Sequence, residues 1–139
     1  MTDSHLPASK RTIMVIDDDS DIVEVVRLRL KSKGFNVRCA YSGQQVFADL
    51  GEQKPDLIIL DIMMPNMDGL EVLTRLKGDL STASIPVILL TAKAQYEDFL
   101  KGYKTGANYY ITKPYTESQL LFGINKFLST HQGDSVESP

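Results

Sequence analysis

Five short apolar runs, each followed by a segment with helical periodicity, constrain the fold of this chain more than any other feature. Regular alternation of this kind, with short connections, predicts α/β architecture. We expect one parallel sheet, right-handed crossovers and helices on both faces. The apolar runs cover residues 12–16, 35–40, 57–60, 85–90 and 107–112, and the helical segments cover residues 22–33, 46–50, 70–76, 95–104 and 120–128.

The pattern within these segments predicts where the strands and helices lie. The run at 57–60 is wholly aliphatic, which is typical of a strand buried on both faces. The run at 35–40 alternates apolar and polar residues, as a half-covered edge strand does. Ser20, Ser42 and Thr116 stand where helices should begin, and we expect each to cap its helix. Ser42 and Thr116 are each followed three residues later by Gln, the spacing of a capping box.

Composition excludes several classes of protein. With 42% hydrophobic and 24% charged residues, the 139-residue chain is of ordinary globular type. A net charge of -3 argues against broad binding to nucleic acid or to anionic membranes. Cys39 is the only cysteine, so it has no partner for an internal disulfide, and a reducing compartment is favoured. The first residues lack a signal-peptide pattern, and no apolar run approaches the ~18 residues of a membrane span. We therefore expect a cytoplasmic protein.

The chain has the length of one domain. We expect residues 12–129 to form that domain and residues 1–11 to be a flexible N-terminal segment. Residues 130–139 are polar, small and acidic, which is typical of a disordered tail. We find neither an internal repeat nor a second domain in the sequence.

Residues of complementary chemistry follow four of the predicted strands. Asp17 and Asp18 follow the first strand and Asp61 follows the third, while Thr91 and Lys113 follow the fourth and fifth. Because all strands of a parallel sheet end on the same side, we expect these five side chains at one rim. The alternative is that they are separate helix caps and surface charges, which would require four coincidences.

Three crowded carboxylates repel one another, and a divalent cation relieves the repulsion. Oxygen ligands without His or Cys favour Mg²⁺, or Mn²⁺, over zinc. One of these carboxylates could act as a nucleophile and form an aspartyl phosphate. Lys113 would supply positive charge to the phosphoryl group and Thr91 a hydroxyl. The residues thus predict a metal-dependent site for phosphoryl transfer.

From about residue 11 to residue 129 the sequence resembles the receiver domains of bacterial two-component response regulators. Four motifs carry this resemblance: Val-Ile-Asp-Asp-Asp at 15–19, Leu-Asp-Ile-Met-Met-Pro-Asn-Met-Asp-Gly at 60–69, Leu-Thr-Ala at 90–92, and Gly-Ala-Asn-Tyr-Tyr-Ile-Thr-Lys-Pro-Tyr at 106–115. The resemblance implies a flavodoxin-like (βα)5 three-layer sandwich with strand order 2-1-3-4-5.

The resemblance also implies a role for individual residues. Asp61 would be the phosphoacceptor, and Tyr110 would be an aromatic switch residue that turns inward when Thr91 moves. Thr91 and Lys113 would contact the phosphoryl group, and the peptide bond before Pro114 would be cis. Asp18 and Asp61 would ligate Mg²⁺ by their side chains and Met63 by its backbone carbonyl, whereas Asp17 would hold the ion mostly through water.

A sensor histidine kinase or a histidine phosphotransfer protein would then phosphorylate Asp61. The switch would remodel the face formed by the helix at 95–104, the strand at 107–112 and the final helix, which could also form a homodimer. A downstream protein or an output domain outside this sequence would read the change. Such a protein is not an enzyme in the conventional sense, although it promotes its own Mg²⁺-dependent phosphorylation and dephosphorylation.

Three other functions share part of this pattern. A haloacid-dehalogenase-type phosphatase also forms an aspartyl phosphate, but it places its nucleophile after the first strand in an Asp-x-Asp pattern. A flavin-binding protein of the same topology needs a hydroxyl- and Gly-rich phosphate loop where this chain has three acids. A phosphate-independent pseudo-receiver would not need the complete set of site residues found here.

Overall fold

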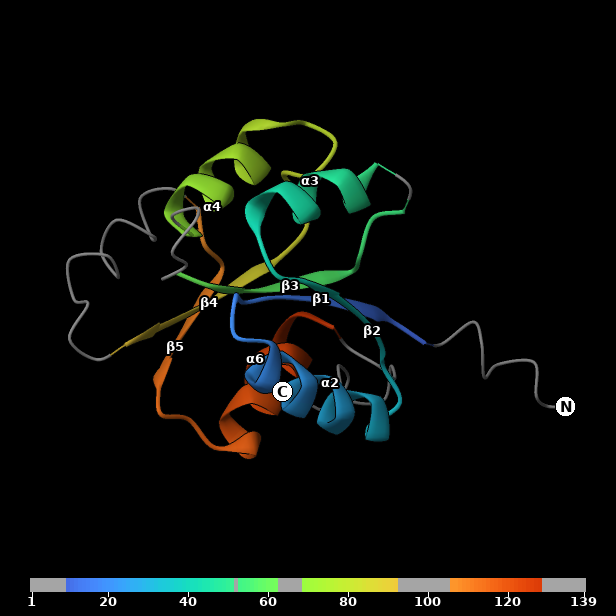
Figure 1. Cartoon of the computed structure of the whole chain (residues 1–139), viewed down its shortest axis with the longest axis vertical. Helices are drawn as coiled ribbons and strands as arrows, with labels where there is room; N and C mark the ends of the chain where they lie inside the picture. Colours follow the sequence, from blue (N-terminus) through green and yellow to red (C-terminus); the bar gives the residue numbers. More distant parts are fainter. Residues whose placement is uncertain (1–9, 52, 63–68, 93–105, 129–139) are drawn as a thin grey trace, which may run out of the picture.

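The fold is described from a computed structural model, which describes residues 10–51, 53–62, 69–92 and 106–128. The predicted helix at 95–104 lies outside these residues. Five parallel strands form one sheet in the order β2-β1-β3-β4-β5 (Figure 1). Both the α/β class and the strand order implied by the resemblance are confirmed. The strands are β1 (Thr12–Ile16), β2 (Asn36–Ala40), β3 (Leu57–Asp61), β4 (Val87–Ala92) and β5 (Tyr109–Lys113).

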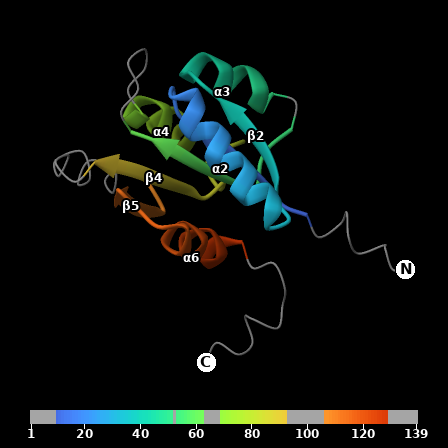
Figure 2. The same cartoon turned by 60° about the horizontal axis from the view of Figure 1, so that its bottom comes forward.

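Helices cover both faces of the sheet, which gives the predicted three layers. α3 (Gly43–Leu50) and α4 (Gly69–Gly78) lie on one face, and α2 (Ser20–Ser32) and α6 (Glu117–Phe127) lie on the other (Figures 1 and 2). Alternate residues of the central strands enter opposite cores. For example, Ile58 and Leu60 pack on the α3–α4 side, whereas Ile59 packs on the α2–α6 side. All five residues of β3 are buried, as the aliphatic run predicts.

The last two strands differ from their predicted bounds. β4 was expected to begin at residue 85, but it begins at Val87 and continues through Ala92. Pro86 has no N–H with which to join a ladder, although its carbonyl accepts the Ile58 N–H at 3.0 Å. β5 begins at Tyr109 and includes Lys113. Thr91 and Lys113 therefore belong to the ends of strands, where ladder pairing fixes their backbones.

Two of the three predicted helix caps are confirmed. The Ser42 hydroxyl accepts the Gln45 N–H, and Thr116 forms a complete capping box with Gln119. The capping box indicated at Ser42 is not completed, because the Gln45 side chain accepts the Tyr41 N–H instead. The prediction for Ser20 is wrong, because Asp19 is the N-cap of α2 and Ser20 is its first helical residue. Among the residues described, no helix combines the length and apolar character that crossing a membrane requires.

Candidate functional site

Asp61 ends the most deeply buried strand of the sheet. The residue is only 5% exposed, and the backbone bends at Ile62. Gly69, the first residue of α4, donates its N–H to the Ile62 carbonyl at 3.0 Å. A Cβ at Gly69 would lie 2.5 Å from the Asp61 carbonyl oxygen and 2.5 Å from the Ile62 Cα. Glycine therefore lets α4 begin against the backbone that carries Asp61.

Three carboxylates meet at this end of the sheet. Oxygen atoms of Asp17, Asp18 and Asp61 all lie within 4.8 Å of one another, as the strand exits predict. Asp17 is 2% exposed, whereas Asp18 is exposed. The Oδ1 of Asp17 accepts the Asp19 N–H at 3.0 Å, while its buried Oδ2 has no hydrogen-bond donor among the described residues. Within the described part of the chain, the cluster thus holds a buried carboxylate oxygen that lacks a donor.

The electrostatics of this cluster suit a cation. The pKa of Asp17 is raised from 3.8 to about 7, chiefly by burial and also by the nearby charge of Asp61, although the Asp19 N–H and Lys113 act to lower it. An all-oxygen donor set with one buried carboxylate held in a costly environment fits a hard divalent cation such as Mg²⁺. The predicted ligand Met63 lies outside the described residues.

Lys113 supplies the positive charge predicted for the site. Its Nζ lies 3.2 Å from Asp61 Oδ2, and its side chain is 31% exposed. Pairing of β4 with β5 places Lys113 beside Ala92, one residue beyond Thr91. Thr91 is buried, and its hydroxyl lies 3.3 Å from the Ala92 carbonyl. Because β3 pairs Asp61 with Leu90, the Thr91 backbone lies one position beyond Asp61 at the same rim.

The structure also locates the remaining residues implied by the resemblance. Tyr110 is buried in the core between the sheet and helices α3 and α4. The peptide bond between Lys113 and Pro114 is cis, as predicted. Thus Asp17, Asp18, Asp61 and Lys113 come together, with Thr91 on the neighbouring strand end.

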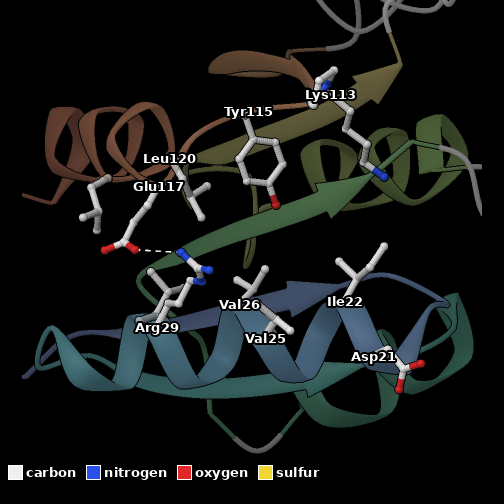
Figure 3. Close-up of a pocket in the computed structure, with 12 residues that line it drawn as sticks. Asp21, Ile22, Val25, Val26, Arg29, Lys113, Tyr115, Glu117 and Leu120 are labelled. Atoms are coloured by element: carbon white, nitrogen blue, oxygen red, sulfur yellow. Dashed lines mark hydrogen bonds and ion pairs between the residues drawn. The ribbon is translucent and has the colours of Figure 1, made fainter.

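A groove of about 490 Å³ opens beside this cluster, between α2 and α6. Lys113 lines one part of it, and the ring of Tyr115 points into the space between the two helices (Figure 3). Ile22 and Val25 contribute apolar surface from α2 that is 39% and 49% exposed. An ion pair between Arg29 and Glu117, 2.8 Å long, joins the two helices across the groove. The phosphoacceptor candidate therefore lies next to a largely apolar surface.

Two features of the site were missed from the sequence. From the sequence, Asp19 was expected to be only one of three acids. In the structure its backbone N–H donates to Asp17 Oδ1, and its side chain caps α2. The available signal in the sequence was an Asp directly before a predicted helix, where Asp is a preferred N-cap residue. In the sequence, the Asp-Gly pair at 68–69 indicates only a turn, whereas the backbone at Asp61 requires that Gly69 has no side chain.

Comparison with known proteins agrees with this geometry. The model of the response regulator receiver domain matches residues 13–125. The chain is 39% identical over 130 residues to the phosphate regulon transcriptional regulatory protein PhoB of Pseudomonas aeruginosa, covering 93% of this chain and 56% of that protein. It is 40% identical over 116 residues to the DNA-binding dual master transcriptional regulator RpaA of Synechocystis, covering 84% of this chain and 48% of that protein.

A solved structure gives the same result. The signal receiver domain of a signal transduction histidine kinase from Syntrophus aciditrophicus matches with a TM-score of 0.80 at 30% identity, covering 93% of this chain and 94% of that one. The chain spans about half the length of the curated relatives it matches. The match of the family model across most of the sequence shows that the chain belongs to the response regulator receiver domains of two-component signal transduction.

Proposed function

We propose that this domain accepts a phosphoryl group on Asp61 in a Mg²⁺-dependent reaction. The observation that carries the proposal is the position of the Asp61 carboxylate, which at a buried strand end lies close to two other carboxylates and pairs with the Lys113 ammonium. Asp17, Asp18 and Asp61 would hold Mg²⁺, with Mn²⁺ as a substitute, and the Met63 carbonyl is a further ligand implied by the family. The ion would neutralise charge on the transferred group.

In the proposed reaction an Asp61 oxygen attacks the phosphorus of the donor. The new P–O bond forms as the bond from phosphorus to the leaving nitrogen or oxygen breaks, and the leaving atom keeps the electron pair. Lys113 already lies 3.2 Å from Asp61 Oδ2 and would pair with the phosphoryl oxygens. The chain accelerates its own modification and returns to its starting state by hydrolysis, so its enzymatic character is limited to this self-directed chemistry.

The phosphoryl group would then shift an existing conformational equilibrium. It adds negative charge and acceptor oxygens at Asp61, to which Thr91 and Lys113 would bind. Movement of Thr91 would change the space beside Tyr110, which is already buried in this structure. The change in the populations of the two conformations is limited by the difference in the phosphoryl group's interaction free energy with each of them. We infer that the changed face includes β5 and α6, and that a target protein, an output domain or a second copy reads it.

The donor would be a protein, either a sensor histidine kinase or a histidine phosphotransfer protein. The groove between α2 and α6 supports this, because it exposes Ile22 and Val25 next to Lys113. A helix with an apolar side could cover this surface while presenting a phosphohistidine to Asp61. PhoB and RpaA are named as transcriptional regulators. A transcriptional output for the whole protein is one form that the response could take.

Intact-mass spectrometry tests the phosphoacceptor directly. Incubation with acetyl phosphate and Mg²⁺ should add one acid-labile phosphoryl group to the wild-type chain, and chelation of the metal should prevent it. The Asp61→Asn variant should gain none, whereas the control Asp49→Asn should behave as wild type. Undiminished labelling of Asp61→Asn would sink the assignment. A wild-type chain that is never labelled would point instead to the phosphate-independent pseudo-receiver.

A further inference from the structure

The third acid after β1 has no part in the function proposed above. We propose that Asp19 is a positioning residue for the metal site: by capping α2, it fixes the backbone N–H that orients the Asp17 carboxylate. This inference rests on the proposed function, since it concerns the proposed metal ligand Asp17. It concerns a residue that would touch neither the metal nor the phosphoryl group.

Asp19 is held firmly by the first turn of α2. Its Oδ1 accepts the Asp21 N–H at 3.0 Å and the Ile22 N–H at 3.3 Å. Its carbonyl accepts the Val23 N–H at 3.0 Å. Val23 is fully buried against the sheet, so the helix that Asp19 caps is itself anchored to the core. The position of Asp19 is thereby tied to the packing of α2.

Asp17 is in turn held by Asp19. The Asp19 N–H donates to Asp17 Oδ1 at 3.0 Å, and the Asp17 N–H donates to the Ala40 carbonyl at the end of β2 at 3.2 Å. One carboxylate oxygen is thus fixed by a donor, while Oδ2 is buried without a donor among the residues described. Fixing Oδ1 leaves Oδ2 for a cation bound at Asp18 and Asp61, or for a water on that cation.

Loss of the cap should therefore loosen the carboxylate. Without the Asp19 side chain, two N–H groups at the start of α2 lose their acceptor, and the first turn frays. The Asp19 N–H would then no longer be fixed opposite Asp17 Oδ1. Since a lost N-cap commonly corresponds to about a fivefold change in an equilibrium constant, we expect Mg²⁺ binding to weaken about fivefold.

The negative charge of Asp19 offers a competing explanation, because any carboxylate near a cation favours its binding. Asparagine separates the two effects. It caps helices about as well as aspartate, but it carries no charge. If capping matters, Asp19→Asn keeps the affinity for Mg²⁺, whereas Asp19→Ala loses it. If charge matters, both substitutions weaken binding equally.

Calorimetric titration of the full chain with Mg²⁺ tests the inference, with circular dichroism to show that each variant is folded. We expect Asp19→Ala to raise the Kd about fivefold and Asp19→Asn to stay within about twofold of wild type. Ser42→Ala removes the N-cap of α3 and is the matched control. It should lower the unfolding midpoint by an amount similar to Asp19→Ala and leave the Kd unchanged.

Three results would overturn the inference: equal weakening by Asp19→Ala and Asp19→Asn, wild-type affinity in Asp19→Ala, or equal weakening by Ser42→Ala. These results are distinct from failure of the proposed function. If the wild-type chain binds no Mg²⁺, the metal site itself is wrong and the positioning role falls with it. If the wild-type chain binds Mg²⁺ and one of the three results appears, only the role of Asp19 is wrong.

Discussion

Replacing Asp17 with asparagine should stabilise the metal-free protein at neutral and alkaline pH. Burial, reinforced by the negative charge of Asp61, raises the pKa of Asp17 from 3.8 to about 7 in the folded protein. In the unfolded chain the carboxyl group loses its proton near its ordinary pKa. Folding at pH 8 therefore forces a buried charge that the Asn variant does not carry.

The size of the effect follows from the same pKa. A rise from 3.8 to about 7, at about 1.36 kcal/mol per pKa unit, corresponds to about 4 kcal/mol as an upper bound. The folded protein binds the extra proton, so wild-type stability should fall as the pH rises from about 4 to about 7 and then level off. Asn keeps an acceptor for the Asp19 N–H, and its buried amide still costs some free energy. We therefore expect a net gain of about 1–3 kcal/mol at pH 8.

Urea unfolding in EDTA, followed by circular dichroism at pH 5 and pH 8, measures the difference. The gain for Asp17→Asn should be larger at pH 8 than at pH 5. Asp21→Asn, which removes an exposed charge from the same segment, should show no such gain. A variant less stable than wild type at pH 8, or a gain that does not change with pH, would refute the reasoning.

Three further predictions concern the surroundings of the site. Gly69→Ala should lower the free energy of unfolding, measured in urea, by about 1–3 kcal/mol, because the new Cβ would lie 2.5 Å from the backbone at Asp61. The control Gly78→Ala places its Cβ in open space and should be neutral. Lys77→Ala should lower the same free energy of unfolding by about 1–3 kcal/mol, since Lys77 Nζ donates to the carbonyls of residues 83 and 85 at 3.0 and 2.8 Å. The control Lys31→Ala, at an exposed position, should change it little. Val25→Asp places a charge in the groove and should slow phosphorylation by a cognate histidine kinase about tenfold. Labelling by acetyl phosphate should keep the wild-type rate. Equal slowing of both reactions would contradict a docking role for the groove.

The sequence predicts the layers and the rim of the sheet well, because these depend on simple periodicities. The wholly aliphatic run at 57–60 predicts a strand that is buried on both faces. The acids after residue 16 follow a parallel strand, so they must lie at the same edge of the sheet as Asp61. Strand order is different. Periodicity does not decide which strands are neighbours, so the order came from the resemblance and was then confirmed by the pairing of β1 with both β2 and β3.

What the sequence did not predict depends on individual hydrogen bonds and close approaches, which periodicity does not specify. Asp19 and Ser20 are both good capping residues, and only the hydrogen bonds to Asp21 and Ile22 decide for Asp19. An Asp-Gly pair normally indicates a turn, and nothing local reveals that Gly69 approaches the backbone of Asp61. In the sequence, Lys77 likewise resembles any charged residue on a helix surface. Only the structure shows that its Nζ donates to the carbonyls of residues 83 and 85.

Direct chemical mapping of the modified residue is the most direct test of the account. After treatment with acetyl phosphate and Mg²⁺, reduction with borohydride converts an aspartyl phosphate to homoserine, which peptide sequencing by mass spectrometry locates. We predict homoserine at position 61 and at no other aspartate, with none formed in the presence of EDTA. Homoserine at position 17 or 18 with Asp61 unmodified would contradict the account.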